Sequence, residues 1–256
     1  MDPAQRSAHE QDIKSVQLVL AKLCKIAHKT VNSTTILLPA WKAPLGELKL
    51  DIHLIPCNVT TRWNSTFDML DMAIRYQLAI DLITQKRDPG LQDLELTSDE
   101  WKLAKQLQGI LQILKEATIY FSCSTPSLAT MIPAMDHINE VFLDYSINDR
   151  YHLAIHIAIG LAKKTLNRYY ELTDSSKVYC ITMILHPRHK LTYFCNTKWE
   201  PRWIETAEHL VQEEFEKYLA NLEADDVQVI EEVQGGLGVK PTGNIFDGLA
   251  AFAPPK

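Results

Sequence analysis

The sequence predicts an all-α protein: a helical bundle with at most one or two short strands near residues 48–55 and a disordered C-terminal tail. Apolar residues recur three and four positions apart through most of residues 13–222, which is the spacing of one helix face. A capping pattern and several prolines stand where such helices would begin. Strict alternation of apolar and polar residues, the mark of a half-buried strand, occurs clearly only at 48–54.

The composition is that of a soluble globular protein. The chain has 256 residues, of which 46% are hydrophobic and 23% charged, enough for one large domain or two small ones with a proper core. The apolar runs are too short to span a bilayer, and the N-terminus has no charged-then-apolar leader, so we expect neither a membrane nor secretion. The five cysteines are odd in number and far apart, and no CxxC occurs. We therefore expect small core residues in a reducing compartment rather than disulfides or a zinc finger.

Charge is distributed unevenly along the chain. The net charge of −6 argues against a generic nucleic-acid binder. The last fifth is acidic, whereas the first fifth is basic through six lysines: Lys14, Lys22, Lys25, Lys29, Lys42 and Lys49. Any phosphate contact should therefore fall in the N-terminal half, and a solvated lysine face is the equally open alternative.

The first sixty residues predict one helix and an irregular stretch. The apolar spacing over 13–31 predicts an amphipathic helix with lysines on its other face. Residues 36–41 lie close to two prolines and predict a loop with a helical turn. Residues 48–54 form either a lone strand or an extended linker that ends at Pro56.

Three helices are predicted in the middle of the chain. One long, nearly all-round apolar helix covers 64–85 and should be central and buried. Thr97-Ser98-Asp99-Glu100 is a capping box that opens the next helix, which continues to Phe121. A third begins at Pro126-Ser127 and reaches Tyr145, with a kink expected at Pro133.

Three more helices and the tail complete the chain. They are predicted over 151–172, over 178–185, where β-branched residues would also suit a strand, and from Pro201 to 222. After Leu222 an acidic, then Gly- and Pro-containing composition predicts disorder. The expected domains are therefore 1–60 (helix, loops and possible strand), 61–222 (helical domain) and 223–256 (disordered tail).

The most informative motif is Thr61-Arg62-Trp63-Asn64-Ser65-Thr66-Phe67-Asp68-Met69-Leu70. A guanidinium grips phosphate through two parallel N–H bonds, and an indole face accepts an unstacked base. The alternative is a plain helix start, with Asn64 or Ser65 as the N-cap and Trp63 in the core. The residues alone leave both interpretations open.

The motif resembles the signature of the hAT (hobo/Activator/Tam3) superfamily of DNA transposases. A second stretch agrees with this, from Tyr169-Tyr170 through Ser175-Ser176-Lys177-Val178-Tyr179 and 184–191 to Trp199 and Trp203. It is similar to the family's RNase-H-fold segment, except that His186 stands where an acid is usual. The similarity runs from about residue 20 to 222 and implies a helical insertion region, which supports a helix rather than a strand at 178–185.

The resemblance also implies that catalysis is lost. Phosphoryl transfer in the family needs three carboxylates around two metal ions, because hard cations require oxygen ligands. Asp51 is the only candidate relic of these acids. The zinc-finger (BED-related) domain and the dimerisation segment of the family have no counterpart either. We therefore expect a non-enzyme without cofactor, metal or small-molecule substrate, and by default a monomer.

Two histidine pairs suggest metal sites only weakly. His152 and His156 are four residues apart, but residue 153 is Leu where a metalloprotease would have Glu. His186 and His189, with Cys195 nearby in sequence, have no regular zinc spacing, so any metal site there would be incidental. Arg188, Lys190, Tyr193 and Phe194 mix charge with aromatic rings and are best explained as packing around a turn.

The function expected from the resemblance is DNA binding by a transposase-derived nuclear protein. Arg62 and Trp63, with Thr61 and Asn64, would hold DNA at an unpaired or hairpin end. The alternatives are a helical protein-interaction module and a degenerate fragment with no DNA binding.

Overall fold

The computed structural model is all-α over the residues that it describes, as the sequence predicted, and the described residues contain no strand. These residues are 3–59, 62–86, 90–122, 128–174, 176–187, 189–197 and 199–224; for 3–12, 174 and 222–224 only the backbone is considered. The predicted tail beyond residue 224 lies outside them. None of the described helices is long and apolar enough to cross a bilayer.

The chain divides into two compact units, each of which is described by itself. Unit 1 comprises residues 1–115 and 141–163, and unit 2 comprises 116–140 and 164–256. The elements of unit 1 are α1 (Pro3–Asn32), α2 (Leu37–Glu47), α3 (Trp63–Arg75), α4 (Gln77–Gln85), the 3-10 turn η1 (Gln92–Leu94) and the larger part of α5 (Ser98–Phe121). The elements of unit 2 include η2 (Leu128–Thr130), most of α6 (Met131–Ile147), the second half of α7 (Leu153–Asp174), α8 (Lys177–Leu185), α9 (Lys190–Asn196) and α10 (Pro201–Ala224).

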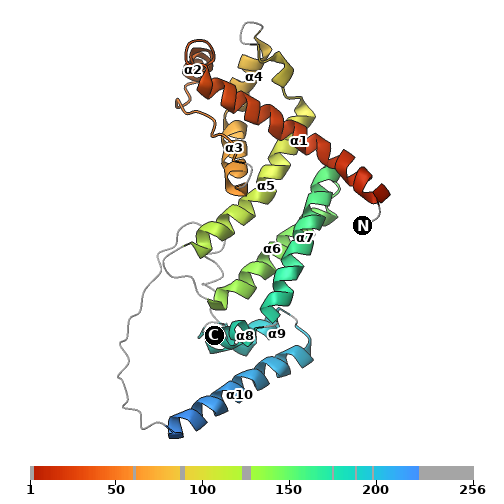
Figure 1. The fold of residues 1–256 in the computed structure, drawn as a ribbon, viewed down its shortest axis with the longest axis vertical. Coiled ribbons are helices and arrows are strands. Elements are labelled where there is room, and N and C mark those ends of the chain that lie inside the picture. Colours follow the sequence, from red (N-terminus) through yellow and green to blue (C-terminus); the bar gives the residue numbers. More distant parts are fainter. Residues whose placement is uncertain are drawn as a thin grey trace. The chain divides into compact units, whose positions relative to one another are not determined.

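The core of unit 1 forms where α2, α3 and α4 gather beside α1 (Figure 1). Its buried residues come from all four helices and include Leu23, Ile26, Trp41, Leu45, Met69, Leu70, Ile80 and Ile83. Two aromatic side chains tie the extended segment before α3 to this core. Trp41 Nε1 donates to the His53 carbonyl at 2.9 Å, and the Tyr76 hydroxyl donates to the Asp51 carbonyl at 2.9 Å. These bonds hold residues 51 and 53 against the core of unit 1.

Several predicted elements of unit 1 differ from the structure. Residues 36–41 are not a loop, because α2 begins at Leu37 and includes the rest of them. Pro39 falls in its first turn, where an N–H would have no intrahelical partner, and Pro44 is accommodated inside the helix. Residues 51–59 are neither helix nor strand, so the linker interpretation is right and the strand interpretation is wrong. Ile55 is buried, whereas Ile52 and Leu54 are exposed.

The single helix predicted over 64–85 is two helices, α3 and α4. Tyr76 lies between them with a non-helical backbone (φ −102°, ψ 21°), and its ring contacts Trp41 with centroids 6.0 Å apart. Tyr76 is thus buried against Trp41 at the point where the helix is interrupted. Leu78 and Leu82 of α4 are exposed, so the expected all-round burial is also wrong.

The capping box is confirmed at the start of α5. The Thr97 N–H donates to Glu100 Oε2 at 2.8 Å, and the Glu100 N–H donates to Thr97 Oγ1 at 3.2 Å. Glu100 also pairs with Lys22 of α1 at 2.7 Å, and the same ammonium donates to the Glu95 carbonyl at 2.8 Å. One carboxylate thus caps a helix and fastens it to α1.

Unit 2 has its own small core. Ala129, Ile132, Met183 and Phe194 are buried there, and Tyr179, Ile184, Tyr193, Trp199 and Ile204 pack against them. The helices predicted at 151–172, at 178–185 and from Pro201 are confirmed as α7, α8 and α10, with α7 starting and ending two residues later than predicted. Pro133 does not kink a long helix, because α6 begins at Met131 and Pro133 lies in its first turn. The predicted start at Pro126-Ser127 lies outside the described residues.

Candidate nucleic-acid interface

The start of α3 is held by a compact polar network. Asn58 Oδ1 accepts hydrogen bonds from Ser65 Oγ at 3.1 Å and from Thr66 Oγ1 at 3.0 Å. Ser65 Oγ also accepts the Val59 N–H at 2.8 Å and lies 2.7 Å from the Arg62 carbonyl. The network joins the backbone on both sides of residues 60–61 to the first turn of the helix, and so fixes the position of Arg62 and Trp63.

Arg62 occupies the N-cap position of α3 with an extended backbone (φ −127°, ψ 97°) and no side-chain cap hydrogen bond. Its N–H donates to the Val59 carbonyl at 2.8 Å, while its side chain is exposed and forms no ion pair with the described residues. The segment starts a helix, as the plain interpretation predicted, but the N-cap is Arg62 and not Asn64 or Ser65. The guanidinium remains available to a ligand.

Trp63 is the first residue of α3, and 39% of its surface is exposed. The alternative in which this indole fills the core is wrong, because the buried side chains of α3 are Met69, Leu70 and Ala73, on later turns. An indole with this much free surface still has room to stack on another ring.

The two other predicted site residues are Asn64, which the structure describes, and Thr61, which it does not. Asn64 follows directly, and its Oδ1 is buried with no hydrogen-bond partner among the described residues. A buried acceptor without a partner costs about 1–3 kcal/mol, so such an atom calls for an explanation. Thr61 lies outside the described residues.

The basic face expected along α1 is only partly free. Lys22 is neutralised by Glu100 and is mostly buried, so it is a structural residue. Lys14, Lys25 and Lys29 are exposed on the same helix, and Lys42 and Lys49 are exposed on and after α2. Lys22 is therefore not part of a solvated lysine face, whereas the other five lysines are exposed to solvent.

A cavity of about 570 Å³ opens beside this region, and sequence reasoning did not find it. Cys24, Lys25, His28 and Lys29 line it from one face of α1, and Cys57 and Asn58 line it from the segment before α3. Gly90, Asp93 and Leu94 complete the wall. The spacing of Lys25, His28 and Lys29 (i, i+3, i+4) could have indicated a shared face, but the opposite wall comes from residues about 30 to 70 positions away.

In both histidine pairs, a histidine side chain contacts neighbouring residues of the fold. His152 precedes α7, where its Nδ1 accepts the Ala154 N–H at 3.1 Å. The rings of His186 and His189 lie 4.7 Å apart, and His189 is buried against Tyr193. Within the described ranges no three His, Cys, Asp or Glu side chains come together as metal ligands do. Arg188 lies outside these ranges.

Asp51, the candidate relic of an active-site acid, has an exposed side chain, and the contacts above use only its carbonyl. Among the described residues, Asp51 belongs to no group of three or more side chains that could hold a metal ion.

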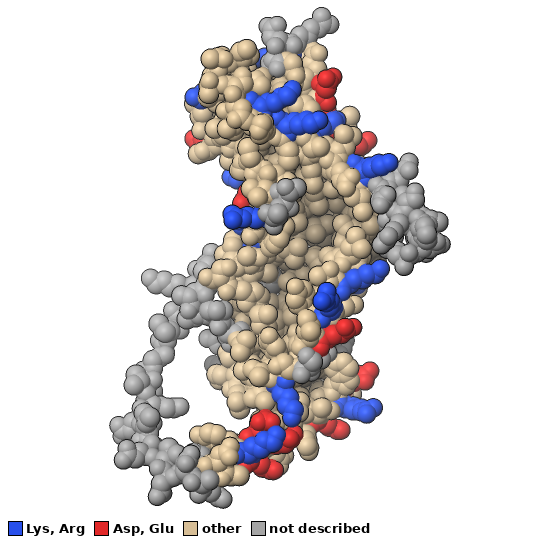
Figure 2. Space-filling view, in the orientation of Figure 1, with Lys and Arg blue, Asp and Glu red and all other residues tan. Residues whose placement is uncertain are grey.

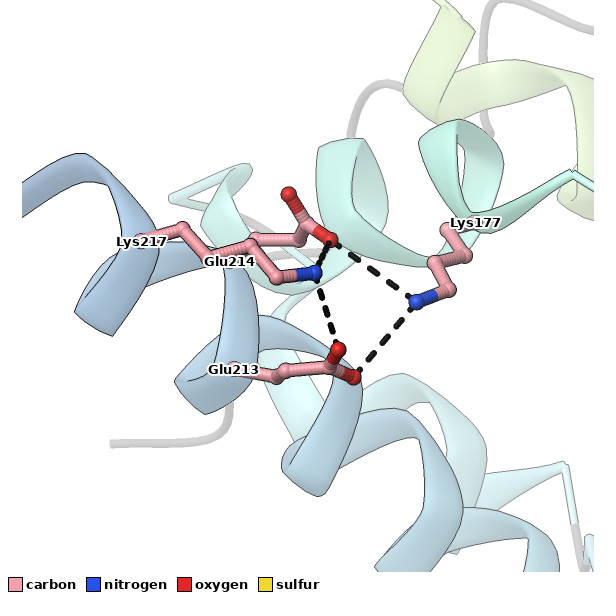
Figure 3. Close-up of polar contacts among 4 residues, drawn as sticks. All are labelled: Lys177, Glu213, Glu214 and Lys217. Carbon is pink, nitrogen blue, oxygen red and sulfur yellow. Dashed lines mark hydrogen bonds and ion pairs between the residues drawn. The ribbon is translucent and has the colours of Figure 1, made fainter. Parts of the chain in front are cut away.

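Unit 2 carries two polar clusters of a different kind. The Asp136 carboxylate accepts from the hydroxyls of Tyr170 and Tyr193, both at 2.7 Å, and burial next to this carboxylate raises the pKa of Tyr193. On α10, Glu213 and Glu214 bind Lys217 at 2.8 and 2.9 Å and reach Lys177 of α8 at 3.4 and 3.7 Å (Figure 3). Figure 2 shows this mixture of acidic and basic side chains on α10.

Comparison with known proteins agrees with the resemblance noted in the sequence. One curated relative, named "Putative transcriptional regulator tpeD", from Talaromyces stipitatus, is 31% identical over 190 residues. The match covers 72% of this chain and 20% of the relative, so the chain spans about a fifth of that protein. No solved structure matches the chain. Residues 12–110, which contain most of α1, all of α2 to α4 and the first half of α5, match the model of the ZBED1 RNase-like helical domain, a family derived from hAT transposases.

Proposed function

We propose that the protein binds DNA at the N-terminal end of α3, holds an unpaired base there, and does not cleave the strand. The observation that carries this proposal is the exposure of Arg62 and Trp63 side by side at a helix start that is otherwise held by hydrogen bonds. The hydrogen bonds hold the backbone that carries these two side chains, so binding has to order the side chains but not the chain itself.

The neighbouring Asn64 supports the same proposal. Its buried Oδ1 is an acceptor without a partner among the described residues, next to the exposed indole. A base stacked on Trp63 could supply an N–H donor to this acceptor only if the Asn64 side chain turned outward on binding. The helix N-terminus adds a partial positive charge that favours phosphate. Thr61, by its place in the motif, belongs to the same proposed interface.

The biological role that we infer is that of a transposase-derived regulator in the nucleus, acting as a monomer and without catalysis. The support is the family match over residues 12–110 and the regulator name of the Talaromyces stipitatus relative. Two-metal phosphoryl transfer needs several converging carboxylates, and none gather among the described residues.

Binding to a fluorescent hairpin DNA with an unpaired flap, against a blunt duplex of the same composition, tests the proposal. Base stacking on an aromatic ring is worth about 1–3 kcal/mol, so Trp63→Ala should lower the preference for the flapped DNA about 5- to 150-fold. Trp63→Phe should retain part of the preference. Arg62→Lys should weaken binding despite keeping the charge, because the two-pronged contact is removed.

Trp203→Ala is the matched control, since Trp203 is also about half exposed but lies on α10. It should leave both affinities unchanged. If the wild-type protein shows no DNA binding at low salt, the proposal fails and the protein-interaction alternative gains.

A further inference from the structure

We propose that the cavity beside α1 binds a backbone phosphate of the same DNA strand, through Lys25, Lys29 and His28. This inference rests on the proposed DNA binding and adds the place where the sugar-phosphate backbone is held. The cavity volume of about 570 Å³ is in the range of small-molecule sites and exceeds the needs of a lone anion, so a phosphodiester with an adjoining sugar fits.

The charges that line the cavity favour an anion. Lys25 forms no ion pair with any described residue, and Lys29 Nζ only approaches the Gly90 carbonyl, at 3.4 Å. Lys22, one turn earlier on α1, is instead paired with Glu100 at 2.7 Å. Among the described residues of the lining, Lys25 and Lys29 from α1 stand against one acid, Asp93. Since like charges repel, a bound phosphate would relieve the lysine pair.

The cavity shares a wall with the start of α3. Asn58 lines the cavity, and its Oδ1 is the acceptor that holds Ser65 and Thr66 in the first turn of the helix. The same short segment that fixes Arg62 and Trp63 therefore also shapes the cavity. A strand that passes from one site to the other would meet its base contact and its backbone contact at residues that the same hydrogen-bond network joins.

Other occupants fit less well. Cys24, His28, Cys57 and Asp93 all line the cavity, yet no three of these ligand types come within metal-binding reach among the residues described. A neutral apolar ligand would have to bury two ammonium groups next to it, which is costly. Free inorganic phosphate has the same chemistry as the backbone, and the experiment must separate the two.

The test measures the salt dependence of hairpin-DNA affinity for the full chain and for Lys25→Gln/Lys29→Gln. Counterion release predicts that the slope of log affinity against log salt becomes shallower by about 0.9 for each phosphate that the variant no longer neutralises. Paired and flapped DNA should be weakened equally, so the preference for the flap should stay. Trp63→Ala should behave in the opposite way, with a lower preference and an unchanged slope.

Lys14→Gln/Lys42→Gln is the matched control, with the same change of net charge at two exposed lysines outside the cavity. It should change the slope less than the cavity variant does.

Asp93→Asn gives a second test, in which DNA affinity is expected to increase. Removing the acid that the described lining contains should raise DNA affinity up to about fivefold, as expected for an exposed charge interaction.

The outcomes distinguish the two proposals. Absence of DNA binding overturns both. Flap-selective binding whose slope is the same in the wild type and in Lys25→Gln/Lys29→Gln overturns the cavity assignment alone. Inorganic phosphate that competes with DNA better than chloride at equal ionic strength, in the wild type but not in the cavity variant, supports it. Phosphate that saturates the cavity without displacing DNA overturns the assignment to the DNA backbone.

Discussion

The start of α3 in unit 1 and the surface of α10 in unit 2 both gather polar side chains, but they use them differently. At α3, Ser65 hydrogen-bonds to the Asn58 side chain and to backbone groups of Val59 and Arg62, so it fixes a conformation. At α10, Glu213 and Lys217 belong to a solvent-exposed charge cluster joined by flexible side chains. Ion pairs of the second kind contribute little because water and salt screen them.

A dense set of charges is therefore not the best sign of a site in this protein. In the α10 cluster, Lys217 pairs with both Glu213 and Glu214. Arg62 and Lys25, in contrast, have no ion partner among the described residues. A cationic side chain that has no ion partner and lies at an ordered position can bind a phosphate group. Three substitutions probe this contrast, and they are taken in descending order of the change in stability that we expect.

The largest effect should come from Trp41→Ala in unit 1. The indole is fully buried, contacts Tyr76 and donates to the His53 carbonyl, so its removal leaves a cavity and an unpaired carbonyl. We expect a loss of about 3–5 kcal/mol of unfolding free energy, measured by urea denaturation. Trp203, whose indole is about half exposed, provides the control, and Trp203→Ala should cost far less. Equal losses would contradict the assigned core.

A smaller effect is expected from Tyr193→Phe in unit 2. The change removes a 2.7 Å hydrogen bond to the Asp136 carboxylate but keeps the ring, and hydrogen bonds to charged groups are worth about 1.5–3 kcal/mol. Urea denaturation of the variant measures the loss. Tyr218→Phe, at an exposed position of α10, is the control and should be silent.

The same residue predicts a pH dependence. Burial, and then the nearby Asp136, raise the pKa of Tyr193 above its ordinary value of 10.0. The unfolded chain therefore ionises first as the pH rises, so the stabilisation is complete below about pH 10 and is lost above it. The wild type should lose stability above about pH 10 more steeply than Tyr193→Phe, and parallel curves would contradict this.

The smallest effect should come from Lys217→Gln on α10. Hydrogen bonds to Glu213 and Glu214 raise the pKa of Lys217 to about 12, and the same bond from Lys217, together with Lys177, lowers the pKa of Glu213. The stabilisation from the raised pKa of Lys217 would be lost only as the pH rises toward 12. The stabilisation from the lowered pKa of Glu213 would be lost as the pH falls below the ordinary glutamate pKa of 4.5. Because all these groups are exposed, Tm near neutral pH should not change measurably. A drop in Tm that high salt abolishes would show that the cluster matters more than we infer.

The elements that sequence analysis predicted well are those with a local cause. The capping box at Thr97 and Glu100, the proline at the start of α10 and the apolar spacing of α1 each act within one or two turns. The elements that it missed depend on distant partners. Tyr76 interrupts the helical pattern where its ring meets Trp41, and α2 forms around prolines because its apolar side chains pack against α1 and α4.

The candidate site divides in the same way. Residue type and spacing were enough to establish that the protein is helical, that Arg62 and Trp63 are adjacent, and that the first fifth of the chain is rich in lysine. The folded chain was needed to show that Trp63 is exposed, that Lys22 is neutralised, and that Lys25, Lys29 and Asn58 line one cavity. Exposure and ion pairing depend on which side chains from remote parts of the chain come within a few ångströms, and helical periodicity carries no information about that.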